Sequence, residues 1–369
     1  MRIGIPKEIK VHEYRVGMTP NGVKELVSQG HELIVETLAG DKIGFSDQDY
    51  LSAGAKISNN REEIWKTSEL IIKVKEPQPD EAKLLNEGQI LFTYLHLAAS
   101  EELTDDLLSS NCTAIAYETI TDSNGRLPLL APMSEVAGRM SVQAGAHSLE
   151  ISQQGRGVLL AGVPGVTPGK VVILGGGVVG TNAAQMAIGL GADTTIFDKS
   201  PDRLRELDTL YHGKLKTCYS TRENILEAIQ TADLVIGAVL VPGAAAPKLV
   251  RKEDLKLMNK GAVIVDVAID QGGCFETSRA TTHQDPTYLI DDIVHYCVAN
   301  MPGAVARTST LALTNATLPY IEKLAGADPI KLMMNDSFLA AGLNIHQGEV
   351  YCPGVAEAFN RSLRLIDQL

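Results

Sequence analysis

The feature that most constrains this chain is the glycine-rich segment 175–180, Gly-Gly-Gly-Val-Val-Gly. It follows an apolar, β-branched run at residues 171–174 and leads into a segment of small residues. In a strand–turn–helix unit, Gly175 permits the tight turn, Gly177 lets the backbone approach a pyrophosphate, and Gly180 lets the helix pack closely on the strand. The helix N-terminus then offers free N–H groups to phosphates. The pattern predicts a dinucleotide-binding unit; the alternative is a glycine-packed corner without a ligand.

A second strand is expected over residues 192–197, ending at Asp198. Asp198 lies 18 positions after Gly180 (198 − 180 = 18), close to the spacing of about 20 at which a carboxylate binds the ribose hydroxyls. A carboxylate there accepts hydrogen bonds from a 2′-OH and repels a 2′-phosphate, so NAD is favoured over NADP. Lys199 and Arg203 lie nearby in the sequence and can offset this repulsion, although Arg203 can equally stack on the adenine or its ribose.

The chain has 369 residues, more than one hydrophobic core normally supports, so two domains are expected. Its first part alternates β-type runs with helical patterns, which is typical of a parallel sheet covered by helices. The strands expected there are 2–5, 31–36, 70–75, 89–95 and 112–117. A helix over about 132–154 then leads to the glycine-rich unit, which continues through expected strands at 234–237, 263–268 and 296–298.

Beyond residue 303 the apolar residues return to a helical period. The two expected apolar faces consist of Leu311, Leu318, Ile321 and Leu324, and of Val355, Phe359, Leu363 and Ile366. These helices have no sheet of their own and are expected to return to the first domain. The predicted fold is α/β, with two doubly wound parallel-sheet (Rossmann-like) domains and a cleft between them. Residues 1–130 plus 308–369 form the substrate domain, and residues 131–307 form an inserted NAD-binding domain.

Composition excludes several classes of function. The net charge of −12 and the absence of a long Lys/Arg block oppose a nucleic-acid partner. The five cysteines are widely spaced, odd in number and without a CxxC pair, which predicts a reducing compartment and neither disulfides nor a metal site. The N-terminus reads as a strand rather than a signal peptide, and the uncharged stretch 171–192 reads as strand–turn–helix rather than a membrane span. We therefore expect a cytoplasmic protein.

Polar residues follow several of the expected strands, where ligands bind in doubly wound sheets. These residues are Lys75, His96, Asp270, Asn300 and Met301. A cation, an imidazole and a carboxylate beside a nicotinamide would form a hydride-transfer site. Each residue also has an ordinary structural interpretation: Lys75 as a solvated strand end, His96 as a packed or surface imidazole, and Asp270 as a turn residue.

Longer segments bear a family resemblance. Residues 1–8, 13–16, 73–77, 94–98, 131–138, 266–273, 308–310 and 313–317 together resemble the NAD-dependent L-alanine dehydrogenases. The resemblance implies that Arg15 and Lys75 bind alanine or pyruvate and that His96 and Asp270 are catalytic. It also implies NAD contacts at Ser134, Val178, Val179, Asp198, Arg203, Ser220, Val239, Leu240, Ile269, Arg279, Val298, Asn300 and Met301, and a homo-oligomer, specifically a hexamer, with the apolar faces of the tail helices as candidate contacts.

The chemistry of these residue types fits the reversible oxidative deamination of L-alanine to pyruvate and ammonium. Arg15 offers a planar fork of donors to a carboxylate, and Lys75 can polarise a developing carbonyl oxygen. Water must add to the imine and ammonia must leave, and His96 can take and give protons near neutral pH. Asp270 would orient water or the ammonium.

Two alternatives remain open. One is the soluble NAD(H)-binding component of a proton-translocating transhydrogenase, which shares the overall layout but lacks the Lys-Glu-Pro and Tyr-Leu-His elements found here at 75–77 and 94–96. The other is a catalytically idle NAD-binding sensor, which the joint presence of Arg15, Lys75, His96 and Asp270 opposes. Saccharopine-forming dehydrogenases are more distant, because they need a pocket for a much longer substrate.

Overall fold

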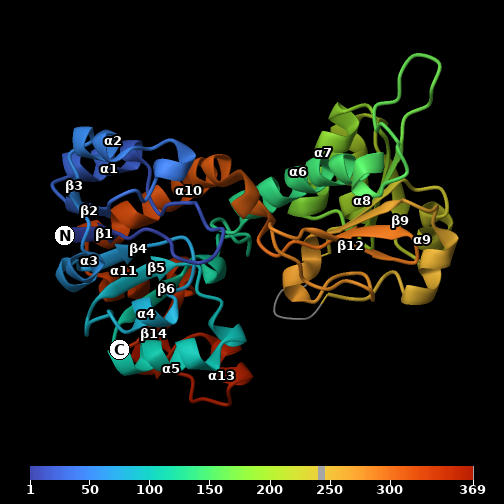
Figure 1. The fold of residues 1–369 in the computed structure, drawn as a ribbon. Helices are drawn as coiled ribbons and strands as arrows, with labels where there is room; N and C mark the ends of the chain where they lie inside the picture. Colours follow the sequence, from blue (N-terminus) through green and yellow to red (C-terminus); the bar gives the residue numbers. More distant parts are fainter. Residues whose placement is uncertain (240–245, 369) are drawn as a thin grey trace. The chain divides into compact units, whose positions relative to one another are not determined.

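The computed structural model describes residues 1–239 and 246–368, which form two compact units (Figure 1). Unit 1 consists of Met1–Met133 and Val305–Leu369, and unit 2 of Ser134–Ala304. The boundaries expected from the sequence, after residues 130 and 307, lie close to these limits. Figure 1 shows helices α10 and α11 of the C-terminal part among the elements of the first 130 residues.

The sheet of unit 1 has the strand order β15-β14-β6-β5-β4-β1-β2-β3. Its strands are β1 (Arg2–Ile5), β2 (Glu32–Glu36), β3 (Lys56–Ser58), β4 (Leu70–Ile72), β5 (Ile90–Thr93), β6 (Thr113–Ala116), β14 (Leu343–His346) and β15 (Glu349–Val350). Strands β1 to β6 pair in parallel, and the order 3-2-1-4-5-6 is that of a doubly wound fold. The chain therefore reverses its winding direction between β1 and β4, where such folds bind ligands.

The helices of unit 1 connect these strands and follow them. They are α1 (Pro20–Ser28), α2 (Asp47–Ser52), α3 (Arg61–Thr67), α4 (Pro79–Ala82), α5 (Glu101–Ser110), α10 (Ala306–Gly326), α11 (Pro329–Asn335), α12 (Ser337–Ala340) and α13 (Pro353–Ala358). Local sequence explains where they begin. At α1, for example, the Thr19 side chain accepts the N–H of Gly22 and Pro20 takes the first position.

The C-terminal part corrects the sequence expectation in three ways. Strands β14 and β15 add to the sheet of unit 1 in antiparallel pairs; they were missed because β14 carries buried polar residues that hide its strand pattern. Asn344 donates to Thr119 and Gly342, and His346 pairs with Thr113. On α10, Leu311 is exposed and Leu313 is buried instead. The expected second helical face at 355–366 is not continuous, since α13 ends at Ala358.

Unit 2 has the strand order β12-β13-β11-β10-β7-β8-β9. Its strands are β7 (Lys170–Leu174), β8 (Asp193–Asp198), β9 (Lys216–Tyr219), β10 (Leu234–Gly237), β11 (Val263–Asp266), β12 (Thr287–Ile290) and β13 (Ile293–Tyr296), and its helices are α6 (Ala131–Ser148), which begins in unit 1, α7 (Val178–Gly189), α8 (Pro201–Tyr211) and α9 (Arg222–Ile229). Read from β9, the order is again doubly wound, with β12 added antiparallel. The expected α/β class with two doubly wound sheets is thus confirmed, although both sheets are mixed rather than purely parallel.

Two strands of unit 2 end earlier than the sequence predicted. The strand expected at 296–298 is β13, which ends at Tyr296, and Val298 forms only an isolated bridge with Thr281. The strand expected at 263–268 ends at Asp266, because the next residues turn into a 3₁₀ helix (Val267–Gln271). Because both strands end earlier than expected, Asp270 and Asn300 lie farther along the chain from the sheet than the sequence suggested.

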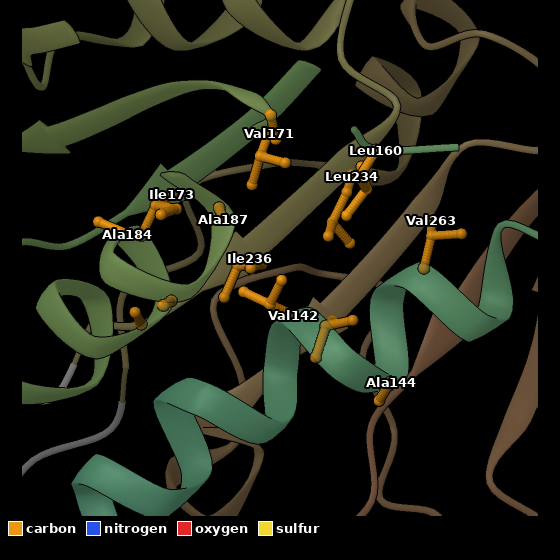
Figure 2. Close-up of a cluster of buried hydrophobic side chains, with 14 of the residues drawn as sticks. Val142, Ala144, Leu160, Val171, Ile173, Ala184, Ala187, Leu234, Ile236 and Val263 are labelled. Carbon is orange, nitrogen blue, oxygen red and sulfur yellow. The ribbon is translucent and has the colours of Figure 1, made fainter. Parts of the chain in front are cut away.

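The core of unit 2 explains why the uncharged stretch 171–192 is a strand and a helix. Figure 2 shows alternate residues of β7 and β10, such as Val171 and Leu234, packing with the small residues of α7 and with α6. A Cβ at Gly145 of α6 would lie 2.6 Å from the Leu234 side chain, so glycine is what allows this close approach. Among the described residues, no helix is both long and apolar enough to cross a membrane.

Candidate active site

Four polar side chains follow four neighbouring strands of unit 1. Arg15 follows β1, Lys75 follows β4, His96 follows β5 and Glu118 follows β6. Since these strands are parallel and adjacent, their carboxyl ends meet at one edge of the sheet, which includes the switch point between β1 and β4. The structure thus brings Arg15, Lys75 and His96 to one edge, together with a carboxylate that the sequence reasoning did not single out.

Arg15 is buried, with 2% of its surface exposed. Its Nε and Nη2 donate to the two carboxylate oxygens of Glu13, at 2.7 and 2.6 Å, and its Nη1 lies 3.2 Å from Sδ of Met133. Burial alone would lower the pKa of Arg15, but the pairing with Glu13 outweighs it and raises that pKa. The Nε–Nη2 edge of the guanidinium, one of its two-donor edges, therefore faces Glu13.

Lys75 lies three residues beyond the end of β4 rather than at its last position (75 − 72 = 3). Its backbone is held on both sides: its N–H donates to Glu8 Oε1 at 3.2 Å, and its carbonyl accepts from Thr93 Oγ1 at 2.9 Å. Its Nζ lies 3.4 Å from Glu76 Oε2. Lys75 is thus a half-buried, anchored cation and not a solvated strand end.

His96 has a left-handed backbone, with φ 49° and ψ 36°, a conformation that is costly for a residue other than glycine. The Glu118 carboxylate stabilises it by accepting the N–H of Leu95 (3.1 Å) and of His96 (2.6 Å). The imidazole Nδ1 lies 3.8 Å from Glu118 Oε1, and the Tyr94 ring stacks on it at 6.0 Å between centroids. Glu118 could have been found by asking which residue follows the strand expected at 112–117.

The His96 side chain is about half exposed and lines a cavity of about 280 Å³. The polar lining also includes Glu76, Gln78, Ser100, Glu102 and Asp106. A small molecule can therefore reach the imidazole directly. His96 is therefore not a packed core histidine, whereas the alternative of a surface imidazole is compatible with this exposure.

In unit 2 each glycine of the turn has a distinct steric reason. Gly175 has φ +106°, and a Cβ there would lie 2.7 Å from the carbonyl oxygen of Ala238. A Cβ at Gly180 would overlap the carbonyl oxygen of Gly175. Gly177, by contrast, caps α7, and among the described residues, its two chain neighbours aside, no atom lies within 4 Å of the place its Cβ would take. Protein packing therefore explains Gly175 and Gly180, whereas the open space at Gly177 suits the approach of a ligand.

Asp198 lies at the end of β8, as expected, and both of its oxygens also support the local backbone. Oδ2 accepts the N–H of Gly176 and Oδ1 that of Ser200, each at 2.8 Å. Arg203 donates to the Gly176 carbonyl and to Thr181 Oγ1, each at 2.7 Å. Arg203 thus also supports the glycine turn, a role that the sequence did not indicate.

The other residues implied in NAD contact lie after strands of unit 2 or on α6. Ser220 follows β9, Val239 follows β10, Ile269 lies in the 3₁₀ helix after β11, Val298, Asn300 and Met301 follow β13, and Ser134 lies near the start of α6; Leu240 lies outside the described residues. Val298 and Met301 are buried, with 0% and 3% of their surface exposed. Arg279 is exposed, with its guanidinium 4.2 Å from the centre of the Tyr288 ring.

Asp270 is exposed in the 3₁₀ helix, four residues past β11 (270 − 266 = 4). Its loop is organised by Asp266, which is buried and accepts the N–H groups of Ala268 (3.1 Å) and Cys274 (2.8 Å) and the hydroxyl of Ser278. Burial raises the pKa of Asp266, and these hydrogen bonds oppose the rise. Sequence reasoning missed Asp266, because its position inside a strand gave no sign of a site.

The five cysteines are free thiols. Within residues 1–239 and 246–368, no group of three or more His, Cys, Asp or Glu side chains has the arrangement needed to hold a metal ion.

Comparison with known proteins gives a consistent result. Residues 4–137 match the model of the alanine dehydrogenase/PNT N-terminal domain, and residues 141–353 that of the C-terminal domain. The chain belongs to the alanine dehydrogenase/PNT family. It is 60% identical over 359 residues to the alanine dehydrogenase of Halomonas elongata, with 97% of each chain covered, and 55% identical over 358 residues to that of Bacillus subtilis, with 96% of this chain and 94% of the relative covered.

Solved structures of this family agree. A structure of L-alanine dehydrogenase superimposes with a TM-score of 0.95 at 54% identity, covering 98% of this chain and 99% of that one. A transhydrogenase of Sinorhizobium meliloti reaches a TM-score of 0.82 at 25% identity, covering 96% and 99%. Both branches of the family therefore share the fold, and the alanine dehydrogenase is more similar in sequence.

Proposed function

We propose that this protein is an NAD-dependent oxidoreductase that catalyses the reversible oxidative deamination of L-alanine to pyruvate and ammonium. The observation that carries the proposal is the gathering of Arg15, Lys75 and His96 at one edge of a sheet, in a chain 60% identical over its length to an alanine dehydrogenase. A transhydrogenase component needs no such set for a 2-oxo acid.

The residues of unit 2 fit a dinucleotide. The N-terminus of α7 presents backbone N–H groups, and the open space at Gly177 lets phosphates approach them. Asp198, at the end of β8, would accept hydrogen bonds from the ribose and disfavour a 2′-phosphate. When bound, NAD accepts the hydride that leaves Cα of alanine.

In unit 1 the cations hold the substrate. The Arg15 guanidinium, kept charged and oriented by Glu13, would bind the carboxylate. Lys75 would bind the same substrate and polarise the carbonyl oxygen that forms. Their anchoring matters, because misplacing a substrate by about 1 Å can cost about 10²-fold in rate.

Proton transfer is assigned to His96 and Asp270. After oxidation, the imine takes up water and releases ammonia, and both steps need a group that exchanges protons near neutral pH. The exposed His96 imidazole can do this, and the Glu118 carboxylate lies 3.8 Å from its Nδ1. Asp270 would orient the water or the ammonium.

The small-molecule substrates and the homohexamer are proposed from the resemblance, whereas the absence of a nucleic-acid or membrane partner and the cytoplasmic location are proposed from the composition and the sequence patterns. The expected contact face on the tail helices needs revision, because Leu313, Ile321 and Leu324 of α10 are buried within unit 1. Leu159 and Val166, by contrast, are more than half exposed, which makes their segment a better candidate for a subunit contact.

The test is an initial-rate assay that follows NADH absorbance. Consumption of NADH with pyruvate and ammonium together, and formation of NADH from L-alanine, are expected. NADH binding without turnover in either direction would leave the sensor interpretation. Hydride exchange only between two nicotinamide nucleotides would favour the transhydrogenase component.

A further inference from the structure

Glu8 is a buried carboxylate that links the segments that follow β1 and β4 in unit 1. It follows β1 and is 6% exposed. Its Oε1 accepts the backbone N–H of Val74 at 2.6 Å and of Lys75 at 3.2 Å. These two groups belong to the segment that continues past the end of β4. Glu8 therefore fixes the backbone at Lys75 from the neighbouring loop.

The other oxygen of Glu8 belongs to a buried ion triad. Lys73 has no exposed surface, and its Nζ lies 2.9 Å from Glu8 Oε2 and 2.9 Å from Glu81 Oε1. Burial raises the pKa of the Glu8 carboxyl, and the Lys73 ammonium opposes that rise. The ammonium thus supports the charged form of Glu8, the form that accepts hydrogen bonds with both oxygens.

Stability alone does not explain this arrangement. Replacing a buried ion pair by apolar residues of similar volume is often neutral or stabilising, so such a triad is weak evidence of a stabilising role. Its two carboxylates are also not equivalent. The second oxygen of Glu81 accepts the N–H of Gln78 at the start of α4, whereas the second oxygen of Glu8 holds the backbone at Lys75.

We propose that Glu8 is a positioning residue for substrate binding. By holding the N–H groups of Val74 and Lys75, it sets where the Lys75 ammonium stands, while Thr93 holds the carbonyl on the other side of Lys75. Glu81 shares the ion pair with Lys73 but not this function. The inference rests on the substrate-binding role proposed for Lys75.

The test compares Glu8→Gln with the matched control Glu81→Gln in the full-length protein. Each variant removes one negative charge from the triad and leaves Lys73 with one carboxylate. The measurements are the thermal midpoint, the KM for pyruvate and the Kd for NADH. Both variants should lower the midpoint to a similar extent. Only Glu8→Gln should raise the KM for pyruvate, by about tenfold, the scale of a lost charge-assisted hydrogen bond, with the Kd for NADH unchanged.

Equal KM values in the two variants would overturn the proposal. If Glu8→Gln does not fold, Glu8→Asp keeps the charge and shortens the side chain, and a wild-type KM in that variant also overturns it. Lys75→Met distinguishes the substrate-binding role of Lys75 from the positioning role of Glu8. An unchanged KM in Lys75→Met refutes the role of Lys75 itself, whereas a raised KM there with none in Glu8→Gln refutes only the positioning role. Adding Glu8→Gln to Lys75→Met should raise KM no further.

Discussion

Alanine substitutions in the glycine turn separate packing from ligand binding. Gly177 has φ −69° and ψ −162°, a backbone that any residue adopts, and no described residue beyond its chain neighbours lies within 4 Å of a Cβ built there. Gly177→Ala should therefore fold with an unchanged thermal midpoint. Its methyl group would occupy the space through which a pyrophosphate approaches, and crowding of this kind costs about 1–3 kcal/mol. The Kd for NADH should rise by about 10- to 100-fold.

Gly180→Ala is the contrasting variant. Its Cβ would overlap the backbone carbonyl oxygen of Gly175, which cannot move as a flexible side chain can. The same cost of about 1–3 kcal/mol now falls on folding, so the unfolding midpoint of unit 2 should drop by several degrees. NADH binding weakens as well, because the turn shifts.

Gly189→Ala is the control, at the last residue of α7 with nothing within 4 Å. It should leave NADH binding unchanged, with stability equal to or slightly above that of the wild type. The assays are thermal unfolding followed by circular dichroism and titration of NADH by its fluorescence. Wild-type NADH affinity in Gly177→Ala would show that phosphates do not use this helix N-terminus, and the account of unit 2 would be refuted.

Four further predictions concern single side chains. Asp198→Ala should weaken NADH binding and reduce the difference in affinity between NADH and NADPH. Equal use of NADH and NADPH by the wild type would contradict the role of Asp198 in cofactor choice. Arg15→Lys should raise the KM for pyruvate and leave the Kd for NADH nearly unchanged, because the lysine loses the geometry that Glu13 imposes; an unaltered KM would remove Arg15 from the site. His96→Ala and Asp270→Asn should each lower kcat, by about 10²-fold or more for the histidine, with a double variant little worse than the poorer single one; near-wild-type turnover in a folded single variant would remove its role. Burial lowers the pKa of His295, so unfolding takes up a proton, and the free energy of unfolding should fall by about 1.4 kcal/mol per pH unit as the pH drops below about 6.5. His295→Gln should reduce this dependence on pH, measured by urea unfolding at several pH values. An unchanged dependence would exclude His295 as its source.

The sequence was most informative where function and backbone geometry require the same residue. The glycines at 175–180 and Asp198 could be placed from their spacing alone, because turn, helix start and ribose carboxylate occur at fixed intervals along the chain. Arg15, Lys75 and His96, which follow β1, β4 and β5, could be placed for a similar reason. Each residue of the site there follows a strand whose apolar run is easy to recognise.

The partners of those residues could not be predicted. Glu118 accepts the N–H of His96 from 22 positions away, and Glu8 reaches Lys73 across 65 positions. Such pairs depend on strand order, which single-sequence patterns do not specify. Lys73 did carry a signal, since a lysine directly after the apolar run Leu70–Ile72 is expected to need a buried partner.

Strand order also explains the missed strands of the C-terminal part. The polar residues of β14 are satisfied by Thr113 and Thr119, which belong to or follow β6 and so became its neighbours only in the folded sheet. A buried strand with polar residues looks like a loop when its partners are unknown. Similarly, the exposed Leu311 and the buried Leu313 of α10 could not be told apart by helical period alone.

The most direct test of the central claim is a crystal structure of the protein with NAD and pyruvate, a pair that cannot react together. We expect the pyruvate carboxylate within hydrogen-bond distance of Arg15, its carbonyl oxygen near the Lys75 ammonium and the His96 imidazole, and the pyrophosphate on the N–H groups at the start of α7. Pyruvate bound away from all three side chains, or a pyrophosphate away from Gly177, would contradict the account.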